Sequence, residues 1–266
     1  MNQQTHTYRD STLNLAQADN YTLLLQIDNN SFAYAIADGN LLLACETNCS
    51  LSELTDPKQL YERLTADYKS TVISLPAKAF VLIPDSLFTK DNVAEYARLL
   101  DVKFGEKVVA QALDTQNQVV YKVDEQLYNT ATKYGIKNIV FAPKGWMYAI
   151  DRSEPSATDL FLNINSNQVE YAYYKNNRLR FYNKFEFNSV EDLIYYTIFV
   201  SDELELSQQS TALIVSGNIT EEYELYKRLS EYFAVVMIND IRVLDLPANI
   251  PSSQILSLSA LSLCAS

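Results

Sequence analysis

The feature that most constrains the fold is an internal repeat with an offset of 137 residues. Residues 27–40 read IDNNSFAYAIADGN, and residues 164–177 read INSNQVEYAYYKNN. Aligned without a gap, residues 23–43 and 160–180 are identical at 8 of 21 positions. Strand alternation alone explains part of this identity, but the turn asparagines also match. The chain is therefore predicted to contain one structural unit twice.

Each copy begins with three short apolar runs separated by turn residues such as Asp-Asn-Asn and Asp-Gly-Asn, which predicts a β-meander. Helical spacing of apolar residues or short apolar runs then predict the remaining elements. In the first copy these are a helix at 51–68, a strand at 79–84, a helix at 90–102, strands near 107–113 and 117–123, a helix near 124–134 and a strand at 138–142. In the second they are a helix at 190–200, a strand at 211–217, a helix at 221–233 and a strand at 234–238.

The polar stretch 149–159, with Pro155, is interpreted as the linker between two lobes. The expected organisation is an N-terminal extension at 1–21, a first lobe at 22–150 with an insert at about 103–142, a second lobe at 157–250 and a Ser/Leu-rich tail at 251–266. The tail is expected to pack on the body, because exposed leucines at this density would be a liability. A partner-binding tail is the alternative.

The net charge of −12 bears on the class of partner. Neither half is basic: residues 1–150 carry 13 Lys and Arg against 17 Asp and Glu, and residues 151–266 carry 8 against 16. Binding to phosphate backbones or anionic membranes depends on clustered cations. We therefore expect no nucleic-acid partner and no membrane insertion, and we expect a protein or peptide partner instead.

The cysteines and the N-terminus indicate a compartment. Cys45, Cys49 and Cys264 are an odd, sparse set that is typical of reduced thiols. The first residues have no apolar signal core, and the run at 193–200 is far shorter than the roughly 20 residues that span a bilayer. A cytoplasmic location follows as an expectation. Cys45 and Cys49 lack a second ligand pair, and the single histidine, His6, lies in an N-terminus expected to be disordered, so neither a metal site nor a histidine-based active site is predicted.

The doubled βββαβα unit resembles the actin-like ATPase superfamily, which includes actin, the Hsp70 chaperones and the sugar kinases. With its insert, the chain is similar to the cell-division and type IV pilus assembly members. Through the meander, the AFVLIPDSLF stretch and the LIVSGN strand end, it resembles more closely an uncharacterised Bacteroidetes protein family with an actin-like ATPase fold. The resemblance implies an α/β fold of two ribonuclease H-like lobes with a small α+β insert. It implies no particular activity.

In that superfamily the first hairpin of each lobe carries Asp-x-Gly and holds phosphate and Mg²⁺ between the lobes, because glycine lets its amide approach a phosphate. The resemblance places a vestigial ligand site at Asp28, Asn30, Ser31, Asn165, Asn167, Gly217 and Asn218. Asparagine replaces both hairpin glycines and the second aspartate. It keeps the turn, because asparagine tolerates the left-handed region. Its side chain occupies the place of the phosphate, so no cofactor is expected beyond weak Mg²⁺ binding at Asp28.

The leading functional hypothesis is a non-catalytic binding or scaffolding protein, as the pilus-assembly relatives dock short segments of partners. A candidate surface is the tyrosine set of the second lobe: Tyr171, Tyr173, Tyr174, Tyr182, Tyr195 and Tyr196. Tyrosine is common at interfaces, although packing of these rings within the sheet is the alternative.

Two enzymatic alternatives stay open. One is an ATPase or phosphotransferase with an altered site. The other is a metal-dependent ribonuclease H-like nuclease using Asp28, Asp85 and either Glu53 or Glu62, whose carboxylates would have to converge on two metal ions.

Overall fold

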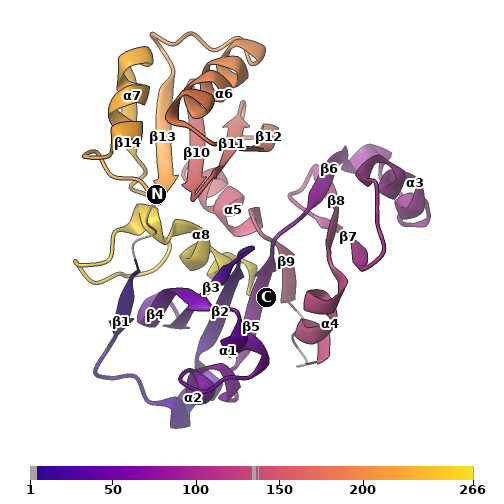
Figure 1. Cartoon of the computed structure of the whole chain (residues 1–266), viewed down its shortest axis with the longest axis vertical. Helices are drawn as coiled ribbons and strands as arrows, with labels where there is room; N and C mark the ends of the chain where they lie inside the picture. The colour runs from indigo at the N-terminus through magenta and orange to yellow at the C-terminus, as the bar shows by residue number, and fades with distance from the viewer. Residues whose placement is uncertain (1–4, 134–135, 137, 266) are drawn as a thin grey trace. The chain divides into compact units, whose positions relative to one another are not determined.

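The computed structural model describes residues 5–133, 136 and 138–265 (Figure 1). The chain divides into two compact units. The first unit comprises Thr5–Tyr148 together with the chain from Leu258 onward, and the second comprises Ala149–Ser257. Each unit is built on its own β-sheet.

The main sheet of the first unit has six strands in the order β1-β4-β3-β2-β5-β9. Their bounds are Thr7–Arg9 (β1), Thr22–Ile27 (β2), Ser31–Asp38 (β3), Leu41–Ser50 (β4), Ser70–Leu75 (β5) and Asn138–Phe141 (β9). Strands β2, β3 and β4 form the antiparallel meander, and β5 and β9 continue it in parallel with β2. Consecutive residues of β2 and β3 are buried, among them Leu23, Leu24 and Leu25, so the core extends over both faces of the sheet.

The helices on this sheet are short. They are η1 (Leu15–Asn20), α1 (Ser52–Thr55), α2 (Tyr61–Thr65), α4 (Glu125–Lys133) and η6 (Ala260–Cys264). Pro57 explains the break between α1 and α2, because proline cannot continue a helix and disfavours helical geometry in the residue before it. The carboxylate of Glu53 accepts the N–H groups of Lys58, Gln59 and Leu60 at 2.9, 3.1 and 3.0 Å, so it fixes the loop that follows Pro57.

An inserted antiparallel sheet has the order β6-β8-β7, with β6 at Ala79–Pro84, β7 at Glu106–Ala112 and β8 at Asn117–Asp124. Its helical segments are η2 (Asp85–Leu87), η3 (Lys90–Asn92), α3 (Val93–Ala97) and η4 (Arg98–Leu100), and its small core centres on Ile83, Leu100 and Val120. The Lys122 ammonium lies 2.8 Å from the Glu106 carboxylate, and both side chains are 9% exposed.

The second unit has the strand order β12-β11-β10-β13-β14. Its strands are β10 (Asp159–Asn165), β11 (Gln168–Tyr174), β12 (Leu179–Glu186), β13 (Ala212–Gly217) and β14 (Val235–Ile238), and its longer helices are α6 (Val190–Glu203) and α7 (Glu224–Tyr232). The order and strand directions repeat those of β4-β3-β2-β5-β9 in the first unit. The fold class predicted from the sequence is confirmed.

Several elements differ from the expectations. The strand β5 was not predicted, and β6, expected outside the insert, pairs with β8 in the inserted sheet. The insert therefore begins earlier than 103, and β9 belongs to the main sheet through its pairing with β5. The run at 79–84 was predicted as a strand because it is more apolar than the run at 70–75, which contains two serines. Apolar character indicates a strand but does not identify the strand with which it pairs.

Contrary to expectation, the described residues near the start of the chain form a strand of the main sheet, whereas the tail packs as expected. The strand β1 pairs with β4 and so extends the main sheet. His6, which precedes β1, is buried, and its N–H donates to the Thr47 hydroxyl. The tail forms η5 (Ser252–Gln254), α8 (Leu256–Ser259) and η6, with Leu258 and Leu261 buried, which is the packing expected from the sequence. The helix α5 (Lys144–Arg152) overlaps the stretch expected to be a linker.

Candidate functional site

The β2–β3 hairpin carries the first set of expected ligand residues. The Asp28 N–H donates to the Ser31 carbonyl oxygen at 2.9 Å, which closes the turn, and Asp28 and Asn30 are exposed. This set belongs to the first unit.

The second set lies where β10 and β13 end. Asn165 pairs with Gln168 across the β10–β11 turn, and the Asn167 carbonyl accepts the Phe187 N–H at 2.8 Å. The left-handed residue of this turn is Ser166, at φ 51°, and not Asn167. The expectation that asparagine supplies the left-handed position is therefore wrong here; the two-residue turn needs a positive φ at its first position, which serine occupies.

Gly217 has a structural reason to be glycine. Its φ is 91°, and a Cβ at this position would overlap the carbonyl oxygen of Ile164 on the neighbouring strand. The Asn218 N–H donates to the same oxygen at 2.7 Å. The structure thus brings Asn165, Gly217 and Asn218 together at the ends of β10 and β13. The close contact between these two strands explains why residue 217 is glycine, and no ligand is needed to account for it.

The carboxylates of the nuclease alternative have other partners. Glu53 binds three backbone N–H groups, which lower its pKa. Asp85 lies after β6 in the inserted sheet and accepts the Gln118 side-chain amide at 2.7 Å. Among residues 5–133, 136 and 138–265, no three His, Cys, Asp or Glu side chains are grouped as a metal site would require.

The tyrosines of the second unit mostly form its core. Tyr171 is fully buried, and its hydroxyl lies 2.8 Å from that of Thr197 on α6. Tyr182 is buried on the other face of the sheet and donates to the Glu170 carboxylate at 2.7 Å. Burial and the adjacent carboxylate raise the Tyr182 pKa. Tyr173 and Tyr174 are also buried, and Tyr195, at 64% exposure, is the one that faces solvent most fully. Strand alternation could not reveal that both sheet faces are covered.

A groove of about 980 Å³ lies on the face of the first unit's sheet that α1, α2 and α4 partly cover. We call it the β2–β5 groove. Leu23, Leu25 and Ile27 of β2 and Ile73 of β5 form its floor. Its walls come from the loop and helix at 54–69 and from α4, with apolar contributions from Leu54, Tyr61, Leu64, Tyr68, Leu127, Ala131 and Ile136. The volume lies near the upper end of the roughly 300–1,000 Å³ usual for ligand pockets.

The second unit shows what covers this face elsewhere in the fold. Leu160, Leu162 and Ile164 are the repeat equivalents of Leu23, Leu25 and Ile27, and they lie in a continuous core with Leu193 of α6 and Leu225 of α7. Helix α6 has 14 residues and a capping box, in which the Ser189 hydroxyl accepts the Asp192 N–H and the Asp192 carboxylate accepts the Ser189 N–H. In the first unit α1 and α2 have only 4 and 5 residues.

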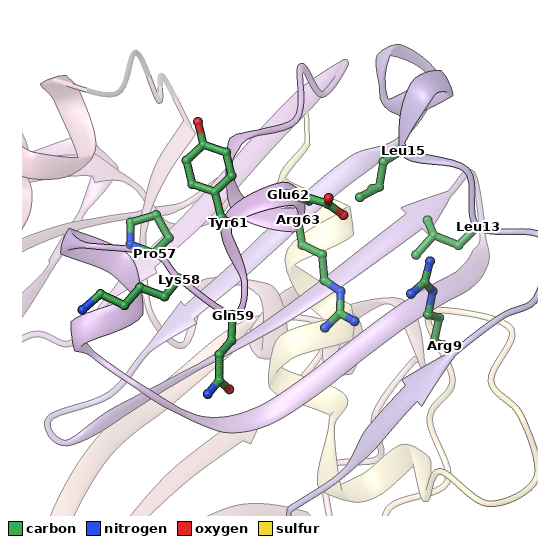
Figure 2. Close-up of a pocket in the computed structure, with 9 residues that line it drawn as sticks. All are labelled: Arg9, Leu13, Leu15, Pro57, Lys58, Gln59, Tyr61, Glu62 and Arg63. Atoms are coloured by element: carbon green, nitrogen blue, oxygen red, sulfur yellow. The ribbon is translucent and has the colours of Figure 1, made fainter.

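A second pocket, of about 450 Å³, adjoins the first. We call it the arginine pocket (Figure 2). Arg9, Lys58 and Arg63 bring positive charge to it, Leu13 and Leu15 supply apolar surface, and Pro57 and Tyr61 line both pockets. Neither concave surface was predicted, since each is built from segments distant in sequence. Pro57 within the helical pattern at 51–68 was the one available signal.

Comparison with known structures shows the fold. A Bacteroides thetaiotaomicron protein with actin-like ATPase fold and unknown function is 17% identical, with a TM-score of 0.78 over 96% of this chain and 100% of that one. The PilM–PilN type IV pilus biogenesis complex gives 14% identity and a TM-score of 0.61, covering 92% and 97%. The cytoplasmic domain of EpsL, from the Vibrio cholerae type II secretion system, gives 10% and 0.51, covering 92% and 96%.

No curated protein matches the sequence. Among the described residues, no helix has both the length and the apolar character needed to cross a bilayer. The profile described as "Protein of unknown function (DUF3822)" matches residues 10–236, which is most of the chain. The chain therefore belongs to the DUF3822 family, and its fold is that of the actin-like ATPases.

Proposed function

We propose that this protein is a binding module that docks a short, mainly apolar segment of another protein in the β2–β5 groove. The observation that carries the proposal is a contrast between the two units. In the second unit a long helix packs directly on Leu160, Leu162 and Ile164. In the first unit the equivalent floor residues are buried, but the apolar walls above them, including Leu54, Leu64 and Leu127, stay partly exposed around a groove. Apolar surface of this kind is stabilised when a partner removes it from water.

The second unit also suggests the form of the segment. Helix α6 presents Leu193, Ile194, Thr197 and Val200 as buried positions, which is the i, i+1, i+4, i+7 spacing of one helix face. A partner segment with apolar side chains at this spacing would supply to the first unit what α6 supplies to the second. Helix-in-groove docking is a recurrent mode of peptide recognition. That one similar solved structure is a complex of two pilus proteins, PilM and PilN, is consistent with such a role.

Panning of displayed random peptides against the full chain tests the proposal. The peptides should be long enough for about four helical turns, and enriched sequences should share apolar residues at helical spacing. Leu127→Asp places a carboxylate on the α4 wall and should weaken binding of an enriched peptide by about tenfold or more, because the charge would be desolvated.

Leu99→Asp is the matched control, because Leu99 is 73% exposed on η4 of the inserted sheet and lines neither pocket. It should leave binding unchanged. Thermal unfolding of each variant checks that the fold is retained. The proposal fails if no apolar peptides are enriched, or if both variants bind an enriched peptide as well as the parent does.

We also propose that the two hairpins form turns and hold no nucleotide. Asn30 and Asn167 carry side chains where the superfamily has glycine, Asn165 offers an amide where it has a carboxylate, and Gly217 is accounted for by the Ile164 contact. Calorimetry with Mg-ATP and Mg-ADP should show no binding in the submicromolar range. Phosphate release that is abolished by Asp28→Ala would contradict this.

The net charge and the cysteines bear on the class of partner and on the compartment in which we propose that the protein acts. The chain carries a net charge of −12, which disfavours nucleic acid as the partner. Cys45, Cys49 and Cys264 are buried thiols, as is typical of proteins in a reducing compartment. Low-salt gel shifts with DNA and RNA should show no salt-sensitive binding.

A further inference from the structure

The β2–β5 groove and the arginine pocket share two walls, Pro57 and Tyr61. A segment lying in the groove can therefore continue past these residues into the pocket. We propose that the partner segment carries an acidic side chain, Asp or Glu, next to its apolar residues, and that Arg9 and Arg63 bind this carboxylate. This inference rests on the proposed function and specifies its ligand further.

Arg63 is held in place by its contacts. Its Nη1 donates to the Tyr34 hydroxyl at 2.6 Å and lies 3.4 Å from the Glu46 carboxylate. Its side chain is 26% exposed, so part of the guanidinium still reaches solvent. A guanidinium has five donors, and these contacts involve a single nitrogen. Among the described residues, none accepts a hydrogen bond from the other Arg63 donors, so they are available in an orientation that is already fixed, which lowers the entropic cost of binding.

Arg9 approaches the same space from β1. In the register of β1 and β4, Arg9 lies opposite Ala44, so it is on the sheet face that also carries Glu46. Figure 2 shows the guanidinium groups of Arg9 and Arg63 directed into the same space, with Leu13 beside Arg9. In the part of the chain that the structure describes, Arg9 makes no ion pair within 4 Å. Its neighbour Asp10 instead accepts hydrogen bonds from Thr12 and Tyr8.

The balance of charge selects a single carboxylate as the ligand. Glu46 lies against Arg63, Glu62 lines the pocket, and Lys58 pairs with Asp56 at 3.4 Å. Three cations and three carboxylates thus balance around the pocket, and in the described part of the chain Arg9 is the cation among them without an ion pair. One carboxylate matches this single cation, whereas a phosphate dianion is poorly matched to it. Two planar guanidinium groups suit the two oxygens of a carboxylate. Leu13 and Leu15 can contact the methylenes of an acidic side chain.

The test uses the peptide library displayed with a carboxy-terminal fusion, so that peptides offer side-chain carboxylates only. Panning against the parent chain should enrich Asp or Glu at one fixed spacing from the apolar residues. Arg9→Gln should weaken an enriched acidic peptide about tenfold or more, the usual effect of losing a charge-assisted hydrogen bond. Arg9→Glu should enrich peptides with Lys or Arg at that position while the apolar residues persist.

Arg178→Glu, an exposed change in the second unit, is the charge-matched control and should leave the enriched sequences unchanged. Apolar enrichment without a fixed acidic position would overturn this inference and leave the proposed function standing. Acidic enrichment that Arg178→Glu alters as much as Arg9→Glu would also overturn it, because the effect would be general attraction. Panning against Leu127→Asp should lose all enrichment, whereas panning against Arg9→Gln should still enrich the apolar residues but no longer the acidic one. This pair of results would support separate apolar and acidic contacts.

Discussion

The two units share the same strand order, but the equivalent faces of their sheets are covered differently. In the second, Leu160, Leu162 and Ile164 are sealed beneath α6 and α7, and the core on this face is continuous. In the first, the equivalent residues of β2 form the floor of a groove of about 980 Å³. The strand order is the same, so the difference arises in the connection after the meander. An uninterrupted helix closes one face, whereas the chain broken at Pro57 leaves a groove with partly exposed walls above floor residues that are themselves buried.

The largest expected effect contrasts the sealed face with the open one. Leu193→Ala removes a fully buried side chain of α6, and we expect it to lower the free energy of unfolding by about 2–5 kcal/mol. Leu64→Ala on the groove wall leaves no new cavity, so its cost should stay below about 1 kcal/mol. Urea unfolding followed by circular dichroism measures both. Equal costs would mean that the groove face is packed like a core.

The strand ends provide a second contrast. Gly217→Ala combines a left-handed backbone with a steric overlap at the Ile164 carbonyl, and we expect a loss of roughly 2–5 kcal/mol. Gly39→Ala is the matched control, since Gly39 also has a positive φ but an added Cβ there would meet open space, and its cost should be about 1 kcal/mol. Thermal unfolding separates the two. A mild Gly217→Ala would show that strand contact does not require this glycine.

The inserted sheet, which the second unit lacks, should make the first unit more sensitive to acid. Hydrogen bonds from Lys122 and the Lys103 N–H lower the pKa of Glu106 to about 2. A lowered folded-state pKa contributes stability above the unfolded pKa, about 4.3, and this is lost as the pH falls toward 2. The stability of the parent should therefore decline over that window.

Glu106→Gln should remove the part of this decline that comes from Glu106. Unfolding midpoints of both proteins, measured from about pH 6 down to about pH 2, give the difference. Parallel pH profiles for the parent and the variant would contradict the assignment.

The smallest expected effect comes from making the open face more like the sealed one. Thr71 pairs with Leu23 as Leu213 pairs with Leu160. Thr71→Leu should fill part of the groove and raise the free energy of unfolding by roughly 0.5–1 kcal/mol. The same change should weaken binding of an enriched peptide. Greater stability with undiminished peptide binding would place the binding site elsewhere.

Sequence reasoning was most successful where a pattern is local and repeated. The turn asparagines and the alternation at 23–43 and 160–180 correspond to the β2–β3 and β10–β11 hairpins, and the resemblance supplied the fold class. The pairing of strands was harder to predict, because an apolar run does not show which strand lies beside it. For this reason β6 was expected outside the insert, and β5, with two serines, was not predicted.

The groove and the pocket could not be predicted from the sequence. Arg9 and Arg63 are separated by more than fifty positions and meet because β1 extends the sheet beside β4. Burial of the second unit's tyrosines likewise depends on what covers each face, which strand alternation does not reveal. Cavities depend on helix length and loop path, and these have weaker sequence signals than turns do.

Hydrogen–deuterium exchange with an enriched peptide tests the central claim most directly. The account predicts slower exchange in the segments that line the β2–β5 groove, namely the helices and loop at 54–71 and α4 at 125–133, when the peptide is added to the full chain. Exchange in α6 and β13 of the second unit should not change. Protection centred on α6 and β13, with none at α2 and α4, would contradict the claim that the open face of the first unit is the docking site.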